Sequence, residues 1–204
     1  GAREFRMSEL CTTPEFRSFA AYLLLNAPRV VETYNAARTD YRRRHRVHAP
    51  GRPVPPLAVR DGRYEVPLWI HRIDEPRRRL FVAPCEQRIE LFAEDTPVAD
   101  LPSAALRSTA THAAPWALEE QGWQLRPRAL TLSAFARLFL ADLFIHGIGG
   151  AKYDEMMEDF ITALLGLPPP PACCVSATAY LPLPHAGIGA ADIVAARHRG
   201  RDLR

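Results

Sequence analysis

The last third of the chain alternates between helical and strand-like patterns, and this alternation most restricts the folds available to it. Residues 130–144 have the pattern of an apolar helix, residues 144–147 that of a short strand or extended turn, and residues 151–165 that of a helix with one apolar stripe. After a proline linker, residues 173–183 have the length and β content of a buried strand, which would enclose Cys173 and Cys174. Such alternation is typical of α/β folds with a parallel or mixed sheet.

The middle of the chain has a different character. Residues 64–93 contain short alternating segments separated by turn-forming residues, which predicts an antiparallel β-meander. Two helices precede it, one opened by Thr13 and Pro14 and the other by Pro28. We therefore predict an α/β fold, namely a three-layer Rossmann-like mixed sheet, complete or partial, with an antiparallel β-meander and flanking helices.

The length of 204 residues suits one ordinary domain. We expect an N-terminal helical pair in residues 1–50, an α/β core in residues 51–184 and a flexible or helical tail in residues 185–204. The core would contain the meander and a glycine-turn helix unit, residues 128–182. The opening residues look like an arbitrary cut, so we expect the chain to be part of a longer protein.

Charge and cysteine content narrow the function classes. The net charge of +3 is too small to indicate a polyanion partner by itself. Six arginines fall within Arg38–Arg52, but basic side chains at a helix C-terminus also complement the helix dipole, so nucleic-acid binding ranks last. The four cysteines form no C-x-x-C pair, which indicates reduced thiols, a cytoplasmic protein and no metal site.

A membrane span is not expected either. The most apolar stretch, residues 129–151, is interrupted by Arg137, Asp142 and His146. A span needs about 20 nearly uncharged residues in succession.

The segment HGIGGAKYDE, residues 146–155, is the main sign of chemistry. It holds Lys152, the only lysine in an arginine-rich chain, beside a histidine that titrates near neutral pH. A glycine turn between strand and helix lets backbone N–H groups approach an acidic ligand. The spacing matches neither a P-loop nor a dinucleotide fingerprint. Alternatively, the lysine is a stray surface residue and the glycines only allow close packing.

We therefore predict a site at this turn that binds a small carboxylate or a sugar-like, neutral hydrogen-bonding substrate. The predicted catalytic residues are His146, which would transfer a proton, and Lys152 and Arg128, which would neutralise charge. The predicted ligand-binding residues are Gly147, Gly149, Gly150, Tyr153 and Asp154.

The order of these elements resembles a known family. Residues 64–184 resemble the C-terminal part of the core domain of the bacillithiol-biosynthesis cysteine-adding enzymes. The motifs that carry the resemblance are RLFVAPCEQRIELF, Arg128-Ala129-Leu130, HGIGGAKYD and PPPPACCVSATAYLP. This chain has Ala129 in place of the family's proline, and Gly-Ile-Gly-Gly in place of its Gly-Pro-Gly-Glu turn. The resemblance implies a Rossmann-like half-domain with a site at the glycine turn.

The sequence thus favours a ligase-like enzyme domain that takes a small-molecule substrate. The alternative is a non-catalytic interaction or structural domain of a longer protein. The family's N-terminal strand and glycine turn are absent from this chain, so a partner chain or self-association could supply the missing part of the sheet.

Overall fold

The structure is a computed structural model, and it describes residues 4–49, 54–108, 113–179, 187 and 189–202. The described helices are α1 (Met7–Leu10), α2 (Pro14–Leu25), α3 (Ala27–Arg44), α4 (Ser103–Arg107), α5 (Ala113–Glu120), α6 (Ala129–Phe139), α7 (Ile148–Leu165) and α8 (Ala190–Asp202). The described strands are β1 (Val59–Arg60), β2 (Arg63–Arg72), β3 (Arg78–Pro84), β4 (Arg88–Ala93), β5 (Thr96–Pro102), β6 (Trp123–Pro127), β7 (Phe144–His146) and β8 (Ala172–Cys174).

The predicted meander is confirmed. Strands β1 to β5 follow one another in an antiparallel sheet, and β6 joins it by pairing with β2. Strands β1 and β6 pair with different parts of the same edge of the long strand β2. Val59 of β1 pairs with Tyr64, whereas Pro127 of β6 pairs with Leu68, further along β2. The middle of β2 and the middle of β3 are buried on both faces, and Ile70 and Leu80 belong to the core.

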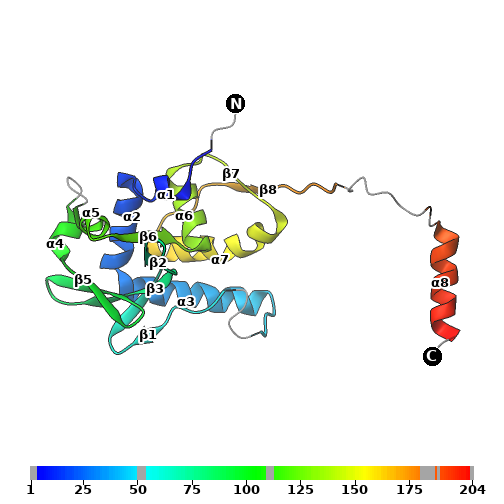
Figure 1. The fold of residues 1–204 in the computed structure, drawn as a ribbon, viewed down its shortest axis with the longest axis horizontal. Coiled ribbons are helices and arrows are strands. Elements are labelled where there is room, and N and C mark those ends of the chain that lie inside the picture. The colour runs from blue at the N-terminus through cyan, green and yellow to red at the C-terminus, as the bar shows by residue number, and fades with distance from the viewer. Residues whose placement is uncertain (1–3, 50–53, 109–112, 180–186, 188, 203–204) are drawn as a thin grey trace.

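The two N-terminal helices form where the sequence predicted them. The Thr13 hydroxyl accepts a hydrogen bond from Phe16 N–H at 3.3 Å, and Pro14 occupies the first turn of α2. Tyr34 of α3 packs edge-to-face against Phe160 of α7, so that α3 and α7 lie side by side (Figure 1). One hydrophobic core contains residues of α2, α3, the sheet, α6 and α7, and it therefore joins the predicted N-terminal pair to the α/β core.

The last third is a strand–helix–strand unit, in which β7 and β8 pair in parallel and α7 connects them. The three-layer Rossmann-like arrangement is not confirmed, because this short pair is the only parallel pairing among the described strands and the larger sheet is antiparallel. The predicted buried strand at residues 173–183 is wrong. Only Ala172–Cys174 is a strand, Cys174 is exposed, and residues 180–183 lie outside the described residues.

Helix α8 lies apart from the rest of the molecule (Figure 1). Its described side chains, residues 190–199, are all exposed. None of the helices in the described part of the chain is long and apolar enough to cross a membrane.

Candidate functional site

The structure divides the predicted site residues between two places. His146 and Asp154 meet, and the glycines lie beside them, whereas Arg128 lies at the opposite end of α6. Arg137, in the last turn of α6, contacts Asp154, and nine residues of helix span about 13 Å. Arg128 therefore does not share a cavity with His146.

The first place is a buried group of charged side chains between β7 and α7. His146 Nε2 lies 2.8 Å from Asp154 Oδ2, and the Arg137 guanidinium donates to the same carboxylate. Asp154 is only 4% exposed, and Arg137 is 2% exposed. Asp154 belongs to the second turn of α7, which places it on the helix face that covers β7. An aspartate so held can orient the imidazole.

The three glycines form the start of α7 and not an open turn before it. Gly147 is the N-cap, and Ala151 N–H makes the first intrahelical bond, to the Gly147 carbonyl, at 3.1 Å. Gly147, Gly149 and Gly150 are exposed, and the backbone at none of them has positive φ. A Cβ on Gly150 would stand 3.0 Å from His146 Nδ1, so that glycine permits the close approach of the histidine ring.

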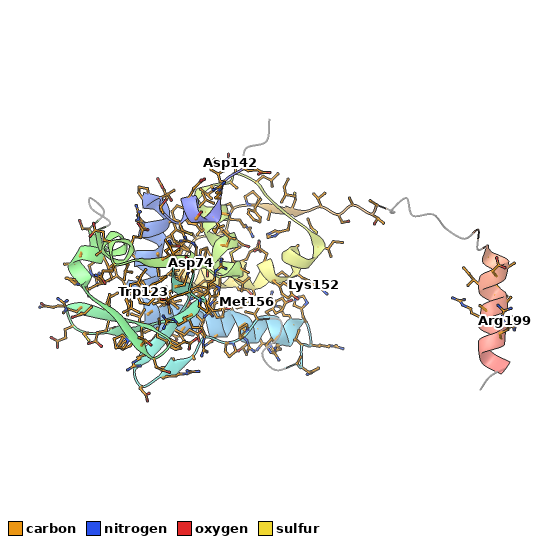
Figure 2. The ribbon with its side chains drawn as sticks, viewed as in Figure 1. Asp74, Trp123, Asp142, Lys152, Met156 and Arg199 are labelled. Atoms are coloured by element: carbon orange, nitrogen blue, oxygen red, sulfur yellow. The ribbon has the colours of Figure 1, made fainter. Side chains whose placement is uncertain are left out.

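Lys152 and Tyr153 lie on the outer surface of α7. Lys152 is exposed, and Figure 2 shows it on this helix. Tyr153 is 38% exposed and lies near Tyr41, with ring centroids 6.3 Å apart. Neither side chain has a described polar contact with His146. Because the three glycines and Lys152 are exposed, the start of α7 is an open surface and not an enclosed pocket.

The second place is a cavity of about 250 Å³ between α3, β2 and the first turn of α6. Arg128 is the residue before α6 and lines this cavity. The Arg128 guanidinium donates to Glu65 Oε1 at 2.5 Å and lies 4.4 Å from the centroid of the Trp69 ring. Its Nε is buried and has no hydrogen-bond partner among the described residues.

Glu65 is the central carboxylate of this cavity and is 2% exposed. Its Oε2 accepts the Ala58 N–H at 2.9 Å and lies 3.9 Å from an Arg79 nitrogen. Arg79 itself is bound by Glu94, and this hydrogen bond holds the pKa of the Glu94 carboxyl below its usual range. The charges of Arg79 and Arg128 are therefore balanced by Glu94 and Glu65, and the positive character of the cavity depends on the unpartnered Arg128 N–H.

The helix start adds to this positive character. The first bond inside α6 is that of Leu132 N–H to the Arg128 carbonyl, at 2.8 Å. The preceding amides of Ala129, Leu130 and Thr131 therefore have no partner within the helix, and these residues line the cavity. No side chain caps this end of α6. A helix start of this kind favours a negatively charged group.

The remaining walls are apolar or aromatic. Burial raises the pKa of Tyr34, at the floor of the cavity, to about 12, while nearby Arg128 lowers it and Glu65 raises it further. One wall, Val54 to Pro56, is fixed to α3 by polar bonds. Asn35 exchanges two hydrogen bonds with the Leu57 backbone, at 2.8 and 2.9 Å, and Arg38 Nε donates to the Val54 carbonyl at 2.7 Å.

The sequence identified Arg128 but missed its neighbours. Glu65, Trp69 and Tyr34 carry no local motif. The pairing of β6 with β2 brings Arg128 to Glu65 and Trp69, whereas Tyr34 reaches the cavity from α3. The one available signal was an acidic residue in an otherwise apolar, alternating strand, since a buried carboxylate requires a charged partner.

A larger groove of about 460 Å³ runs between α3 and α7, but its charges neutralise one another. Arg44 pairs with Asp159, and Arg43 pairs with Asp40 at 2.8 Å. In the basic run Arg38–Arg52, these two arginines and Arg38 thus have protein partners, while Arg52 lies outside the described residues. The groove offers less for a ligand than the Arg128 cavity.

Among the described residues, no group of three or more His, Cys, Asp or Glu side chains is placed to hold a metal ion. Comparison with protein-family models, with curated proteins and with solved structures finds no match to this chain. The function must therefore be argued from the site itself.

Proposed function

We propose that this chain is a small-molecule-binding domain whose ligand carries a carboxylate or similar compact acid, held in the cavity beside Arg128. The predicted ligand class is thus kept, but the binding place moves from the start of α7 to the start of α6. The supporting observation is Arg128 itself. Its guanidinium is fixed between Glu65 and Trp69, yet its buried Nε has no described partner.

The free donors of the cavity suit such an acid. A carboxylate accepts several hydrogen bonds at once, and a planar guanidinium with adjacent helix-start amides presents them without reorganisation. Glu65 is already bound by Arg128 and Ala58 N–H, so it fixes the guanidinium and does not act as a free charge against the ligand. A ligand anion would accept hydrogen bonds from the unpartnered Arg128 N–H and from the amides at the start of α6.

The size and lining of the cavity limit the ligand further. Its volume of about 250 Å³ lies just below the range of about 300–1,000 Å³ that is usual for drug-sized ligands. The walls contain Trp69 and a set of prolines, which favour a flat or apolar body. A small aromatic or branched acid combines both features.

Benzoate, with the neutral benzamide as its matched control, tests this proposal through the fluorescence of Trp69. We expect benzoate to change the emission and benzamide to bind at least tenfold more weakly, a loss of about 1.4 kcal/mol. Trp69→Phe should remove the signal. Arg128→Gln should abolish the preference for the acid, whereas Arg88→Gln, at an exposed pair with Asp100, should leave it unchanged.

Thermal unfolding of each variant separates loss of binding from loss of fold. Equal affinity for benzoate and benzamide would contradict the proposal, as would unchanged benzoate binding by a folded Arg128→Gln variant. Absence of benzoate binding to the folded parent protein at millimolar concentration would also contradict it.

A second candidate is the ligase-like enzyme suggested by the sequence, with proton transfer at His146. The 2.8 Å contact to Asp154 favours it, because an aspartate-held imidazole is a suitable general base or acid. This candidate also includes the three-layer Rossmann-like arrangement that the sequence predicts. The test is an NMR titration with malonate, observing the amides of Gly149 and Gly150. Shifts that vanish in Lys152→Ala support it, and unshifted amides exclude it.

A further inference from the structure

The outer face of the β7–β8 pair is exposed and apolar. Side chains alternate along a strand, so Leu143 and Ile145 point away from the face that carries His146. In the parallel register Ile145 pairs with Cys173, and Val175 continues the same row. Ile145 is 62% exposed and Val175 is 56% exposed.

On the reverse side α7 covers His146 through its bond to Asp154, whereas Cys174, which pairs with His146, is exposed. Parallel strands normally have both faces covered, because helices or other layers pack on each side. Among the described residues, α7 covers part of one side of the β7–β8 pair, while Ile145 and Val175 on the other side stay exposed. An apolar element that packs across both strands would cover them.

We propose that the outer face of β7–β8 binds helix α8 of a second copy of this chain, so that two copies exchange their C-terminal helices. Helix α8 follows β8 in the chain and begins with a small apolar stretch, of which Ile193 is 50% exposed and Val194 is 52% exposed. It stands well away from the body of its own chain (Figure 1), which leaves it available to another copy.

Charge is compatible with this pairing. The sequence has no Asp, Glu, Lys or Arg between Phe160 and Asp192, so nothing on β8 or after it repels an identical chain. Asp142 precedes β7 in the chain, and Arg197 and Arg199 follow the apolar start of α8. Figure 2 shows Asp142 on the body and Arg199 on the distant helix, so the two do not meet within one chain in this arrangement.

The exchange is reciprocal and therefore closed. Each copy offers one face and donates one helix, so that two copies satisfy both contacts and no further chain is recruited. The predicted self-association thus takes the form of a helix-swapped dimer, and it does not depend on what the Arg128 cavity binds.

Sedimentation of the full chain tests the assembly. We expect a concentration-dependent dimer, and we expect Ile145→Asp or Ile193→Asp to weaken it at least tenfold. Ile73→Asp is the matched control, because Ile73 is 68% exposed in the turn between β2 and β3 and should leave dimerisation unchanged. All three sites are exposed, so circular dichroism should show the same fold.

A disulfide test identifies the occupant. Ile193→Cys, in a background with Cys85→Ser and Cys174→Ser, should form an oxidant-induced bond to Cys173 and run as a covalent dimer. Adding Cys173→Ser to this variant should abolish that dimer. A bond formed within one chain, absence of a bond, a monomer at every concentration, or a dimer indifferent to Ile145→Asp would each overturn the proposal.

Discussion

Arg137 and Asp154 form an ion pair inside the protein that joins the last turn of α6 to the second turn of α7. The same guanidinium lies 2.8 Å from a Glu158 oxygen and donates through Nε to the Pro170 carbonyl at 3.0 Å. One side chain therefore holds α6, α7 and the proline segment before β8 together. His146 completes the arrangement from β7.

Removing Asp154 should destabilise the fold strongly. Asp154→Ala leaves the buried Arg137 with the partly exposed Glu158 as its only described carboxylate partner, so the free energy of unfolding should fall by roughly 3 kcal/mol or more. Urea denaturation measures this loss. The control is Glu155→Ala, whose partner His45 is also solvent-accessible and whose loss should cost less than about 1 kcal/mol. Equal losses in the two variants would show that the buried pair stabilises the fold no more than the exposed pair does.

The two neighbouring glycines at the start of α7 should respond differently to alanine. Nothing lies within 4 Å of a Cβ at Gly149, so Gly149→Ala should raise the free energy of unfolding by about 0.5–1 kcal/mol through helix propensity. A Cβ at Gly150 would lie 3.0 Å from His146 Nδ1, so Gly150→Ala should not raise the free energy of unfolding. Thermal unfolding compares them. A more stable Gly150→Ala variant would contradict the fixed position of His146.

Tyr34 should make stability fall at high pH. Its folded-state pKa is about 12, against 10.0 for an unperturbed tyrosine. Below pH 10 both states keep the proton, so Tyr34 adds no pH dependence there. Between pH 10 and about 12 the unfolded state loses the proton first, so stability should fall by up to about 1.4 kcal/mol per pH unit. Urea unfolding from pH 9 to 12 should be measured for the parent protein and for Tyr34→Phe. The difference between them gives the contribution of Tyr34, because burial raises the pKa of Tyr41 in both proteins.

Asn35 should be needed for the wall of the Arg128 cavity. Asn35→Ala removes both hydrogen bonds to the Leu57 backbone, and we expect a loss of about 1–3 kcal/mol together with weaker benzoate binding. Thr39→Ala, one turn along α3 at an exposed bond to the Asn35 carbonyl, serves as the control. If Asn35→Ala lowers stability but leaves benzoate affinity intact, the wall plays no part in binding.

Much of the fold could be predicted because local signals agreed with it. Thr13 and Pro14 mark the start of α2, and alternation identifies β2 to β4. The strand expected at residues 173–183 shows where this fails. An apolar run indicates a surface that needs cover, but its burial depends on elements elsewhere in the chain or in another molecule.

The candidate site was less accessible to sequence reasoning. Arg128 could be identified as charged and close to a helix start, but its bond to Glu65 depends on β2 and β6 coming together. His146 and Asp154, eight residues apart across the start of a helix, were both predicted, and the structure places them in contact. Lys152 was predicted from its rarity and from its place beside the glycine turn, and neither determines the direction of its side chain.

The sharing of β2 between β1 and β6 has a consequence for how the chain emerges from the ribosome. Strands β1 to β5 can form as each hairpin leaves the exit tunnel, but residues 68–72 of β2 must wait for residues 123–127. During that interval the meander carries an open edge with unpaired backbone groups, which is the kind of surface that aggregates or binds chaperones. Translation speed through residues 100–127 should therefore govern how much of this protein reaches the folded state.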